Sequence, residues 1–183
     1  MKLNTEFNPF PTISTNRLSL RTYTLDDKHD LFALRTDVRV MKYLDRPKFN
    51  TIQESEELIQ KILDDVTNNK GISWSISLAN TRQHIGSIGF WKIIPEHFRA
   101  EIGYMLHPDF QGQGIMQEAL KAAVDYGFNQ MNLHSIEANV NPNNQASIKL
   151  LKKSGFIREA YYKENYYFEG NFFDSAIYSL LNK

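Results

Sequence analysis

Only one helical segment in this chain of 183 residues is predicted to join two neighbouring strands of a sheet, and it limits the sheet that the sequence can form. Gln113–Phe128 carries apolar residues at helical spacing, whereas Ala100–Leu106 before it and His134–Val140 after it are typical of strands. Parallel neighbours need such a crossover, while strands joined by short turns pair antiparallel. The sequence therefore predicts a mostly antiparallel mixed sheet with one parallel strand pair.

The other elements follow from changes of hydrophobic period and from capping signals. In chain order we expect a strand at Arg17–Tyr23, a helix from Thr24 to about Arg35 with a short helical turn through Met41, an amphipathic helix from the capping box Thr51–Glu54 to Asn68–Gly71, a hairpin of Ser73–Leu78 and His84–Ile94, a helix between Asn141–Asn143 and Ser154–Phe156, and closing strands Ile157–Tyr166 and Phe172–Leu181. This is an α/β (α+β) fold with about four flanking helices, in one domain spanning residues 1–183.

Composition narrows the function classes. Lys plus Arg (21) equals Asp plus Glu (21), so no overall field draws the chain to nucleic acid or to an anionic membrane. The absence of cysteine removes disulfides, thiolate catalysis and common zinc sites, and the five histidines lack metal-site spacing, so we expect no metal. No stretch is apolar enough to span a bilayer and no secretory signal is present, which favours a cytoplasmic protein.

The segment with the clearest chemistry is the turn between the predicted strand Ala100–Leu106 and the predicted crossover helix Gln113–Phe128. Gly112 and Gly114 let the backbone turn tightly and direct successive N–H groups toward one point at the positive end of a helix. A pyrophosphate fits there, although the turn matches neither a Walker loop nor the dinucleotide motif, because Gln117 replaces the third glycine. The alternative is a plain strand-to-helix turn.

Several motifs in a fixed order carry a resemblance to a family. They are Glu101–Leu106, then Gln111-x-x-Gly114, Asn144-x-x-Ser147 and Ser154-Gly155-Phe156. The chain resembles the GNAT superfamily of N-acetyltransferases, most of all its branch of ribosomal-protein N-terminal acetyltransferases that act on alanine or serine. The resemblance covers nearly the whole chain, from Arg17-Leu18 to the closing Asp174–Leu180.

The resemblance implies acetyl-CoA as cosubstrate, held across a pair of parallel strands that splay apart. Backbone amides of the turn would hold the pyrophosphate, main-chain groups of the first parallel strand would pair with pantetheine, and Asn144 would bond the same arm. The implied cofactor-binding residues are Tyr104, Leu106, Gln111, Gly112, Gln113, Gly114, Ile115, Met116 and Asn144. Met116 stands where the family pattern has Gly or Ala, which we interpret as a local change of packing.

Acetyl transfer to an amine needs a proton acceptor, a stabilised oxyanion and a protonated leaving thiol. By resemblance, Glu101 matches the position of the base in some members; alternatively it is an exposed strand residue paired with Arg99. Ser147 would donate to the CoA sulfur as it leaves. For Asn144 and Ser147 the alternative is that Asn143 and Asn144 cap a helix while the Ser147 side chain packs against its neighbours.

Two further groups have two interpretations each. Lys149, Lys152, Lys153 and Arg158 could meet the 3′-phosphate of the nucleotide, although a solvated helix face is the simpler interpretation. The closing aromatics could line an acceptor slot, yet alternating aromatics on terminal strands more often form core. They are Tyr161, Tyr162, Tyr166, Tyr167, Phe168, Phe172 and Phe173.

The leading hypothesis is therefore an acetyl-CoA-dependent N-acetyltransferase that works by direct transfer in a ternary complex. Its acceptor would be a primary amine at a protein or peptide N-terminus, because an α-amino group with a pKa near 8 loses its proton more readily than lysine. The alternatives are a small-molecule amine acetyltransferase, for an antibiotic, polyamine or amino acid, and a CoA-binding regulatory module without turnover. The branch resemblance is compatible with a homodimer.

Overall fold

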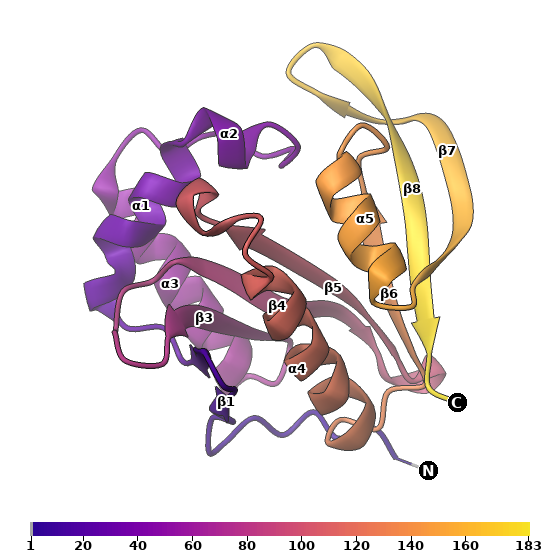
Figure 1. Ribbon diagram of the computed structural model, residues 1–183, viewed down its shortest axis with the longest axis horizontal. Helices are drawn as coiled ribbons and strands as arrows, with labels where there is room; N and C mark the ends of the chain where they lie inside the picture. The colour runs from indigo at the N-terminus through magenta and orange to yellow at the C-terminus, as the bar shows by residue number, and fades with distance from the viewer. Residues whose placement is uncertain (1) are drawn as a thin grey trace.

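The structure, a computed structural model that describes residues 2–183, contains one eight-stranded sheet (Figure 1). Its strands lie in the order β1-β2-β3-β4-β5-β6-β8-β7. Their bounds are β1 Ile13–Ser14, β2 Leu18–Arg21, β3 Ile72–Leu78, β4 Gly86–Ile94, β5 Arg99–Leu106, β6 Ser135–Val140, β7 Ile157–Phe168 and β8 Asn171–Leu181. Only β5 and β6 pair in parallel, which confirms the predicted mixed sheet.

Five α-helices flank the sheet: α1 Lys28–Thr36, α2 Val38–Met41, α3 Ile52–Thr67, α4 Ile115–Asn129 and α5 Gln145–Lys153. The short turn expected before Met41 is α2, which accounts for the fifth helix. Thr24 and Thr51 each lead a capping box, in which Asp27 and Glu54 accept hydrogen bonds from the threonine N–H groups. These reciprocal bonds fix where the first and third helical segments begin.

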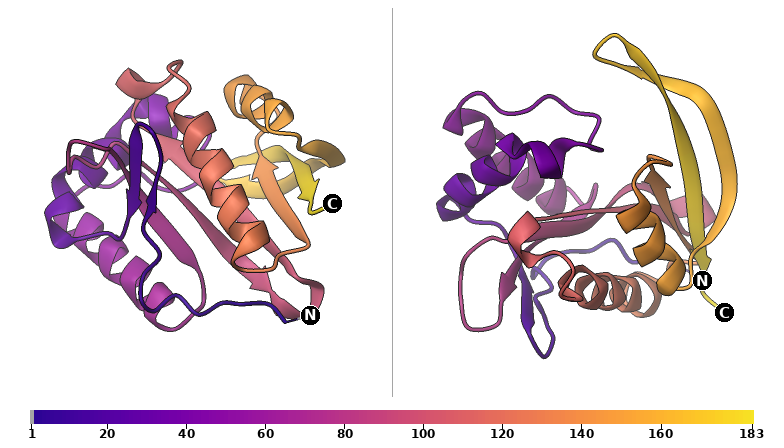
Figure 2. Two further views of the ribbon diagram at one scale, coloured as in Figure 1. Left: turned by 60° about the horizontal axis from the view of Figure 1, so that its bottom comes forward. Right: turned by 45° about the horizontal axis from the view of Figure 1, so that its top comes forward.

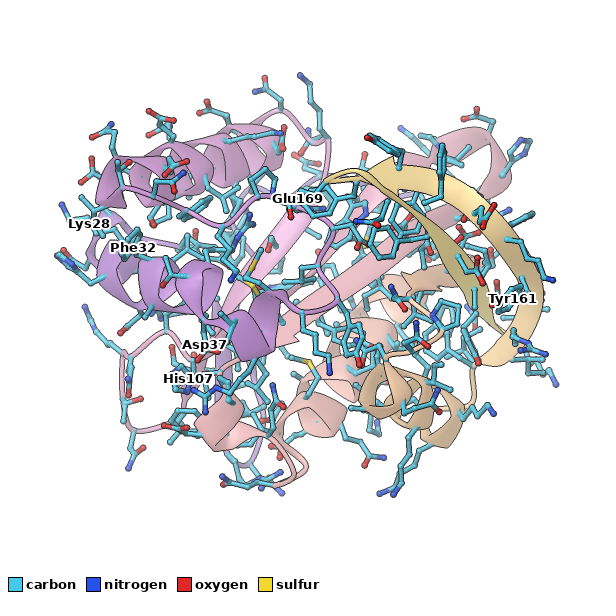
Figure 3. All side chains as sticks on the ribbon, turned by 90° about the horizontal axis from the view of Figure 1, so that it is seen from above. Lys28, Phe32, Asp37, His107, Tyr161 and Glu169 are labelled. Atoms are coloured by element: carbon cyan, nitrogen blue, oxygen red, sulfur yellow. The ribbon has the colours of Figure 1, made fainter. Side chains whose placement is uncertain are left out.

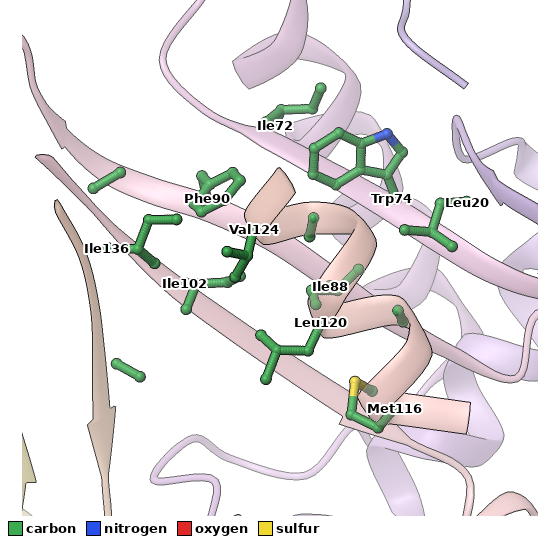
Figure 4. Packing of buried hydrophobic residues seen from close by; sticks show 14 of the residues in the cluster. Leu20, Ile72, Trp74, Ile88, Phe90, Ile102, Met116, Leu120, Val124 and Ile136 are labelled. Atoms are coloured by element: carbon green, nitrogen blue, oxygen red, sulfur yellow. The ribbon is translucent and has the colours of Figure 1, made fainter. Parts of the chain in front are cut away.

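The helices cover both faces of the sheet (Figure 2). On one face, α4 places Leu120 and Val124 against Ile88, Ile102 and other apolar residues of the central strands (Figure 4). On the opposite face, Leu31 of α1 and Ile59 of α3 pack with Tyr23, which follows β2. Leu151 of α5 belongs to the same core as α4. The sheet therefore separates α1 and α3 from α4 and α5.

The parallel pair is short. Only Arg99–Glu101 of β5 pair with Ser135–Glu137 of β6, and both strands continue beyond that point without pairing to each other. The predicted splay is confirmed. It leaves an opening between the carboxyl-terminal halves of two central strands, with α4 and α5 close to it (Figures 1 and 2).

The last two strands form a long curved hairpin that extends beyond the rest of the sheet (Figure 1). The expectation that its aromatics form core is wrong for four of them: Tyr161, Tyr162, Tyr167 and Phe172 are exposed. Figure 3 shows Tyr161 on the outer edge of the hairpin and Glu169 at its tip. The reason is that β7 is an edge strand whose outer half has no helix packed on it.

The first strand, β1, lies outside the sequence expectations. β1 has two residues, too few for alternation to be visible, and it pairs with β2 through Ile13 and Ser14. Among the helices of residues 2–183, none has both the length and the apolar character that crossing a bilayer requires.

Candidate active site

The turn between β5 and α4 exposes a row of backbone N–H groups. Gly112 and Gly114 have φ of 73° and 75°, the left-handed region that side chains disfavour, and Gly114 is the N-cap of α4. Within residues 2–183, the N–H groups of Gly112, Gln113 and Gly114 donate to no acceptor. The first turn of a helix also leaves its own N–H groups, here from Ile115 onward, without intrahelical partners. Together they form a cradle for an anion at the positive end of α4.

Side chains brace this turn from both ends. Gln111 Nε2 donates to the Leu106 carbonyl at 3.0 Å, and Arg17 Nη1 donates to the Gln113 carbonyl at 2.9 Å. Arg17 is itself held by Glu118, with 2.6 Å between Nε and Oε2. The cradle is therefore fixed before a ligand arrives, and its donors are backbone groups rather than the Gln111 side chain.

Met116 points away from the cradle into the core beneath α4 (Figure 4). Its neighbour Ile115 is buried in the same cluster. A larger side chain at position 116 thus fills core volume and leaves its N–H group available, so the change of packing expected there does not obstruct the turn.

The half of β5 that follows Glu101 pairs with β4 but not with β6, so its other edge presents main-chain groups to the opening. His107 N donates to the Ile85 carbonyl on the β4 side, whereas the Leu106 carbonyl accepts from Gln111 on the other side. Because backbone groups alternate in direction along a strand, those of Tyr104 face the same way as those of Leu106. An extended ligand arm in the opening could pair with them like an added strand.

A cleft of about 630 Å³ passes through the opening. Its walls are α1, α3 and the segment between α2 and α3 on one face of the sheet, β4, β5 and β6 in the middle, and the start of α5 on the other face. Residues of the β7–β8 hairpin close one side. A ligand held by the cradle and a second molecule entering from the α1 side would meet in this space.

Glu101 lies on the cleft wall, at the last residue of β5 that pairs with β6. Its Oε1 accepts from Trp91 Nε1 at 3.0 Å, and its Oε2 accepts from Lys92 Nζ at 2.6 Å. The Glu101 side chain is 12% exposed. The alternative interpretation, an exposed residue paired with Arg99, is wrong, because Arg99 pairs with Glu137 on the neighbouring strand.

The contacts of Glu101 depend on a bulge and on a glycine. Between Trp91 and Ile94 the β4–β5 register shifts, and Lys92 adopts a φ of 45°, which turns its side chain toward Glu101. The Trp91 indole lies so close over Gly103 that a Cβ there would be 1.8 Å from Cη2. The sequence does not reveal the contact between Trp91 and Gly103, because this contact depends on the β4–β5 register and on the bulge.

Two hydroxyl groups meet beside the opening. Tyr104 Oη of β5 lies 2.7 Å from Ser147 Oγ of α5, and both residues line the cleft. Burial raises the pKa of Tyr104 to about 12, so its phenol stays protonated at neutral pH. Asn144 is the N-cap of α5 and its Oδ1 accepts from Ser147 N at 3.1 Å. The capping alternative is therefore correct for Asn144, and the residue also lines the cleft.

The far wall joins two segments distant in sequence. Burial, followed by a hydrogen bond to Asp45, raises the pKa of Tyr166, and Asn141 Nδ2 lies 3.5 Å from the same phenol oxygen. Tyr166 is on the β7–β8 hairpin and Asp45 lies between α2 and α3, and both residues line the cleft. Tyr166 is the member of the aromatic set that lines the cleft.

The structure thus groups the predicted site residues into two connected parts. Glu101, Tyr104, Asn144 and Ser147 line one cleft. The other predicted cofactor residues lie at the end of β5, in the turn after it and at the start of α4: Leu106, Gln111, Gly112, Gln113, Gly114, Ile115 and Met116. Lys149, Lys152, Lys153 and Arg158 are exposed. Over the described part of the chain, no group of three His, Asp or Glu side chains is arranged to hold a metal ion.

This combination of a splayed parallel pair, an N–H cradle and a cleft through the sheet defines an acetyltransferase of the GNAT type. Residues 17–157 match the Acetyltransferase (GNAT) domain family. The chain belongs to this family, and it is an acetyl-CoA-dependent N-acetyltransferase.

Individual relatives show the same likeness. An uncharacterized N-acetyltransferase, p20, of Bacillus licheniformis is 36% identical over 172 residues, covering 94% of this chain and 97% of its own. A ribosomal L7/L12 α-N-protein acetyltransferase, RimL, solved with coenzyme A, superposes with a TM-score of 0.85 at 24% identity, covering 93% and 98% of the two chains. Spermidine N-acetyltransferase of Vibrio cholerae, solved with CoA and spermine, gives a TM-score of 0.80 at 25% identity, covering 91% and 96%.

Proposed function

We propose that this protein transfers the acetyl group directly to the α-amino group of a protein or peptide N-terminus, such as that of a ribosomal protein. The observation that carries the proposal is the placement of Glu101 and the Tyr104–Ser147 hydroxyl pair around one cleft that opens beside the N–H cradle. One carboxylate and one donor pair are the two proton-handling groups that direct transfer requires.

The cradle and the opening would hold acetyl-CoA, which supplies the activated thioester carbonyl. The unpaired N–H groups from Gly112 to Met116 lie at the N-terminal end of α4, where a helix favours an anion such as a pyrophosphate. Main-chain groups of Tyr104 and Leu106 would pair with the amides of the pantetheine arm, with Asn144 donating to it. One N–H group of this strand would also stabilise the oxyanion that develops on the carbonyl.

Glu101 and Ser147 would act on opposite sides of the reacting carbon. Glu101 removes a proton from the attacking amine, directly or through one water, while the amine nitrogen forms a bond to the carbonyl carbon. When the carbon–sulfur bond breaks, the Ser147 hydroxyl donates to the thiolate. Tyr104, which burial keeps protonated, donates to Ser147 Oγ and supports that role.

The choice of an α-amino group follows from proton affinity. The acceptor must attack as a neutral amine, and an α-amino group with a pKa near 8 reaches that form at a cost about 3 kcal/mol lower than a lysine with a pKa near 10.4. The likeness to RimL concerns the fold, so this argument and the cleft carry the acceptor assignment.

The second candidate is a small-molecule amine acetyltransferase. The likeness to a spermidine acetyltransferase at 25% identity favours this alternative. The proposal also includes one domain over residues 1–183, a cytoplasmic location and compatibility with a homodimer.

A thiol-release assay combined with mass spectrometry tests the acceptor. The panel contains peptides with free N-termini and internal lysines, the same peptides with blocked N-termini, and spermidine. We expect CoA release and N-terminal acetylation only with free N-termini. Acetyl groups found solely on lysine or on spermidine would refute the α-amino acceptor, and CoA binding without thiol release for any of these amines would support a CoA-binding module.

A further inference from the structure

Arg35, at the end of α1, is a buried cation on the wall of the cleft. The residue is 6% exposed and lines the cleft. Its Nη2 donates to the Pro47 carbonyl at 3.1 Å, and its Nε is buried without any acceptor. The guanidinium lies 4.5 Å from the centre of the Phe49 ring. Among residues 2–183 no carboxylate forms an ion pair with it.

An unpaired buried charge is costly, because desolvation is offset only by a nearby counter-charge and by complete hydrogen bonding. Arg35 has one hydrogen bond for five N–H donors. Burial and the neighbouring Arg46 lower the pKa of Arg35, and only Glu54 opposes this effect. Glu54 is occupied in its capping box with Asn50 and Thr51. The protein itself therefore provides no direct anionic partner for this fork of donors.

Arg35 is connected to Glu101 along the cleft wall. Glu101 accepts a hydrogen bond from the Trp91 indole, and the Arg46 guanidinium lies 5.8 Å from the centre of that ring. Arg46 and Arg35 both line the cleft, and after burial the charge of Arg46 is the next cause that lowers the pKa of Arg35. A molecule with its amine at Glu101 would thus extend past Trp91 toward two arginines.

The charged residues that line the cleft favour an anionic group near Arg35 over a polycation. Its basic residues are Arg35, Arg46, Lys61 and Lys70, and its acidic residues are Asp45, Asp65 and Glu101. Glu101 is paired with Lys92. A polycation would find this carboxylate already engaged, whereas an anion would find Arg35 unpaired.

We infer that the acceptor carries a carboxylate, which binds Arg35 with support from Arg46 while its amine lies at Glu101. This inference rests on the proposed acetyl transfer to an amine. A guanidinium matches a carboxylate through two parallel hydrogen bonds, and Arg35 has the free donors for them. The carboxylate could belong to an acidic side chain near a peptide N-terminus or to the α-carboxyl group of a free amino acid.

Matched acceptors separate these sources. The panel contains C-terminally amidated peptides beginning Ala-Glu, Ala-Gln and Ala-Lys, together with free alanine, free glutamate, alaninamide and spermidine. We expect kcat/KM for the Ala-Glu peptide, or for the free amino acids, to exceed that of the uncharged analogue at least tenfold. A preference for Ala-Glu assigns the carboxylate to a peptide side chain; a preference for free amino acids over alaninamide assigns it to the α-carboxyl group.

The variant Arg35→Met removes the charge while keeping an unbranched apolar stem against Phe49. It should reduce the preference for the anionic acceptor to within about twofold and leave the uncharged acceptor nearly unchanged. Arg35→Lys, which keeps the charge but loses the fork, should fall between the two. Arg82→Met, at an exposed arginine outside the cleft, is the matched control and should keep the full preference.

Calorimetric binding of the same peptides in the presence of CoA provides a readout that does not need turnover. The inference would be refuted by equal binding and equal rates for Ala-Glu and Ala-Gln together with no preference for free alanine over alaninamide. It would also be refuted by an anionic preference that survives in folded Arg35→Met. Acetyl transfer without that preference would leave the proposed function intact. Tighter binding of the anionic peptide without any acetyl transfer would support the carboxylate site and contradict the proposed function.

Discussion

Replacing Gly103 with alanine tests whether the floor of the cleft holds Glu101 in place. The Trp91 indole lies across β5, with its Nε1 bonded to Glu101 and its outer ring over Gly103. A Cβ on residue 103 would lie 1.8 Å from Cη2 and 2.4 Å from Cζ2 of Trp91. The added methyl group therefore cannot coexist with the present position of the ring.

The size of the effect follows from this overlap. The indole must move by roughly 1.6 Å to restore ordinary contact, which is enough to break the 3.0 Å bond between Nε1 and Glu101. A hydrogen bond to a charged group contributes about 1.5–3 kcal/mol, so the loss in kcat/KM should lie between about tenfold and a hundredfold. Lys92 still holds the other carboxylate oxygen, which keeps the effect within this range.

A double-mutant cycle with Trp91→Phe isolates the cause. Phenylalanine lacks both Nε1 and the outer ring, so Gly103→Ala should cost no more than about twofold in the Trp91→Phe background. Binding of CoA should change little in all three variants, because the cradle lies at the other end of β5. If Gly103→Ala were equally damaging with and without the indole, the assigned role of Trp91 would be wrong.

Four further predictions concern single residues. Gly114→Val should weaken CoA binding more than tenfold in calorimetry, because a branched side chain at a φ of 75° distorts the cradle; unchanged affinity in a folded variant would contradict the cradle. Ser147→Ala should lower kcat more than it changes the KM of acetyl-CoA, since the donor is needed as charge appears on sulfur. Glu101→Gln should show a rate deficit that shrinks as pH rises toward 9 and free amine accumulates; a constant deficit would argue against proton removal. Burial lowers the pKa of His84 to about 4 in the folded protein. Below about pH 6.5 the unfolded chain therefore binds a proton at His84 that the folded protein does not bind, so the free energy of unfolding decreases as pH falls. Between pH 7 and pH 5 this loss should be about 2 kcal/mol in urea unfolding, and His84→Gln should remove it.

The sequence predicts the fold well where a periodic pattern is long. Ile52–Thr67 and Ile115–Asn129 lie within a residue or two of their expected bounds, and the single crossover helix gave the one parallel pair. β1 could not be predicted from two residues. Core packing is the wrong interpretation for four hairpin aromatics, because alternation shows that a strand has two faces, not whether another element covers either of them.

The candidate site was predictable only where a motif is local. Asn144 and Ser147 are three residues apart, so their meeting at the start of α5 follows from helix geometry. Trp91 and Gly103 meet through strand register, which no spacing in the sequence reveals. In the sequence, Arg35 looks like any arginine in the last turn of a helix, where its positive charge would interact favourably with the helix dipole. Its burial comes from the chain that folds back over it at Pro47 and Phe49.

The groups proposed to bind and react lie where regular structure is interrupted. A paired strand or helix interior satisfies its own N–H and carbonyl groups, so it has none to offer a ligand. Here the parallel pairing stops after Glu101, the bulge redirects Lys92, and Gly114 begins α4 in a left-handed conformation. Each interruption releases backbone donors or turns a side chain into the cleft. Substitutions that regularise these positions should therefore stabilise the sheet and reduce acetyl transfer, and a regularised variant with full activity would contradict this link.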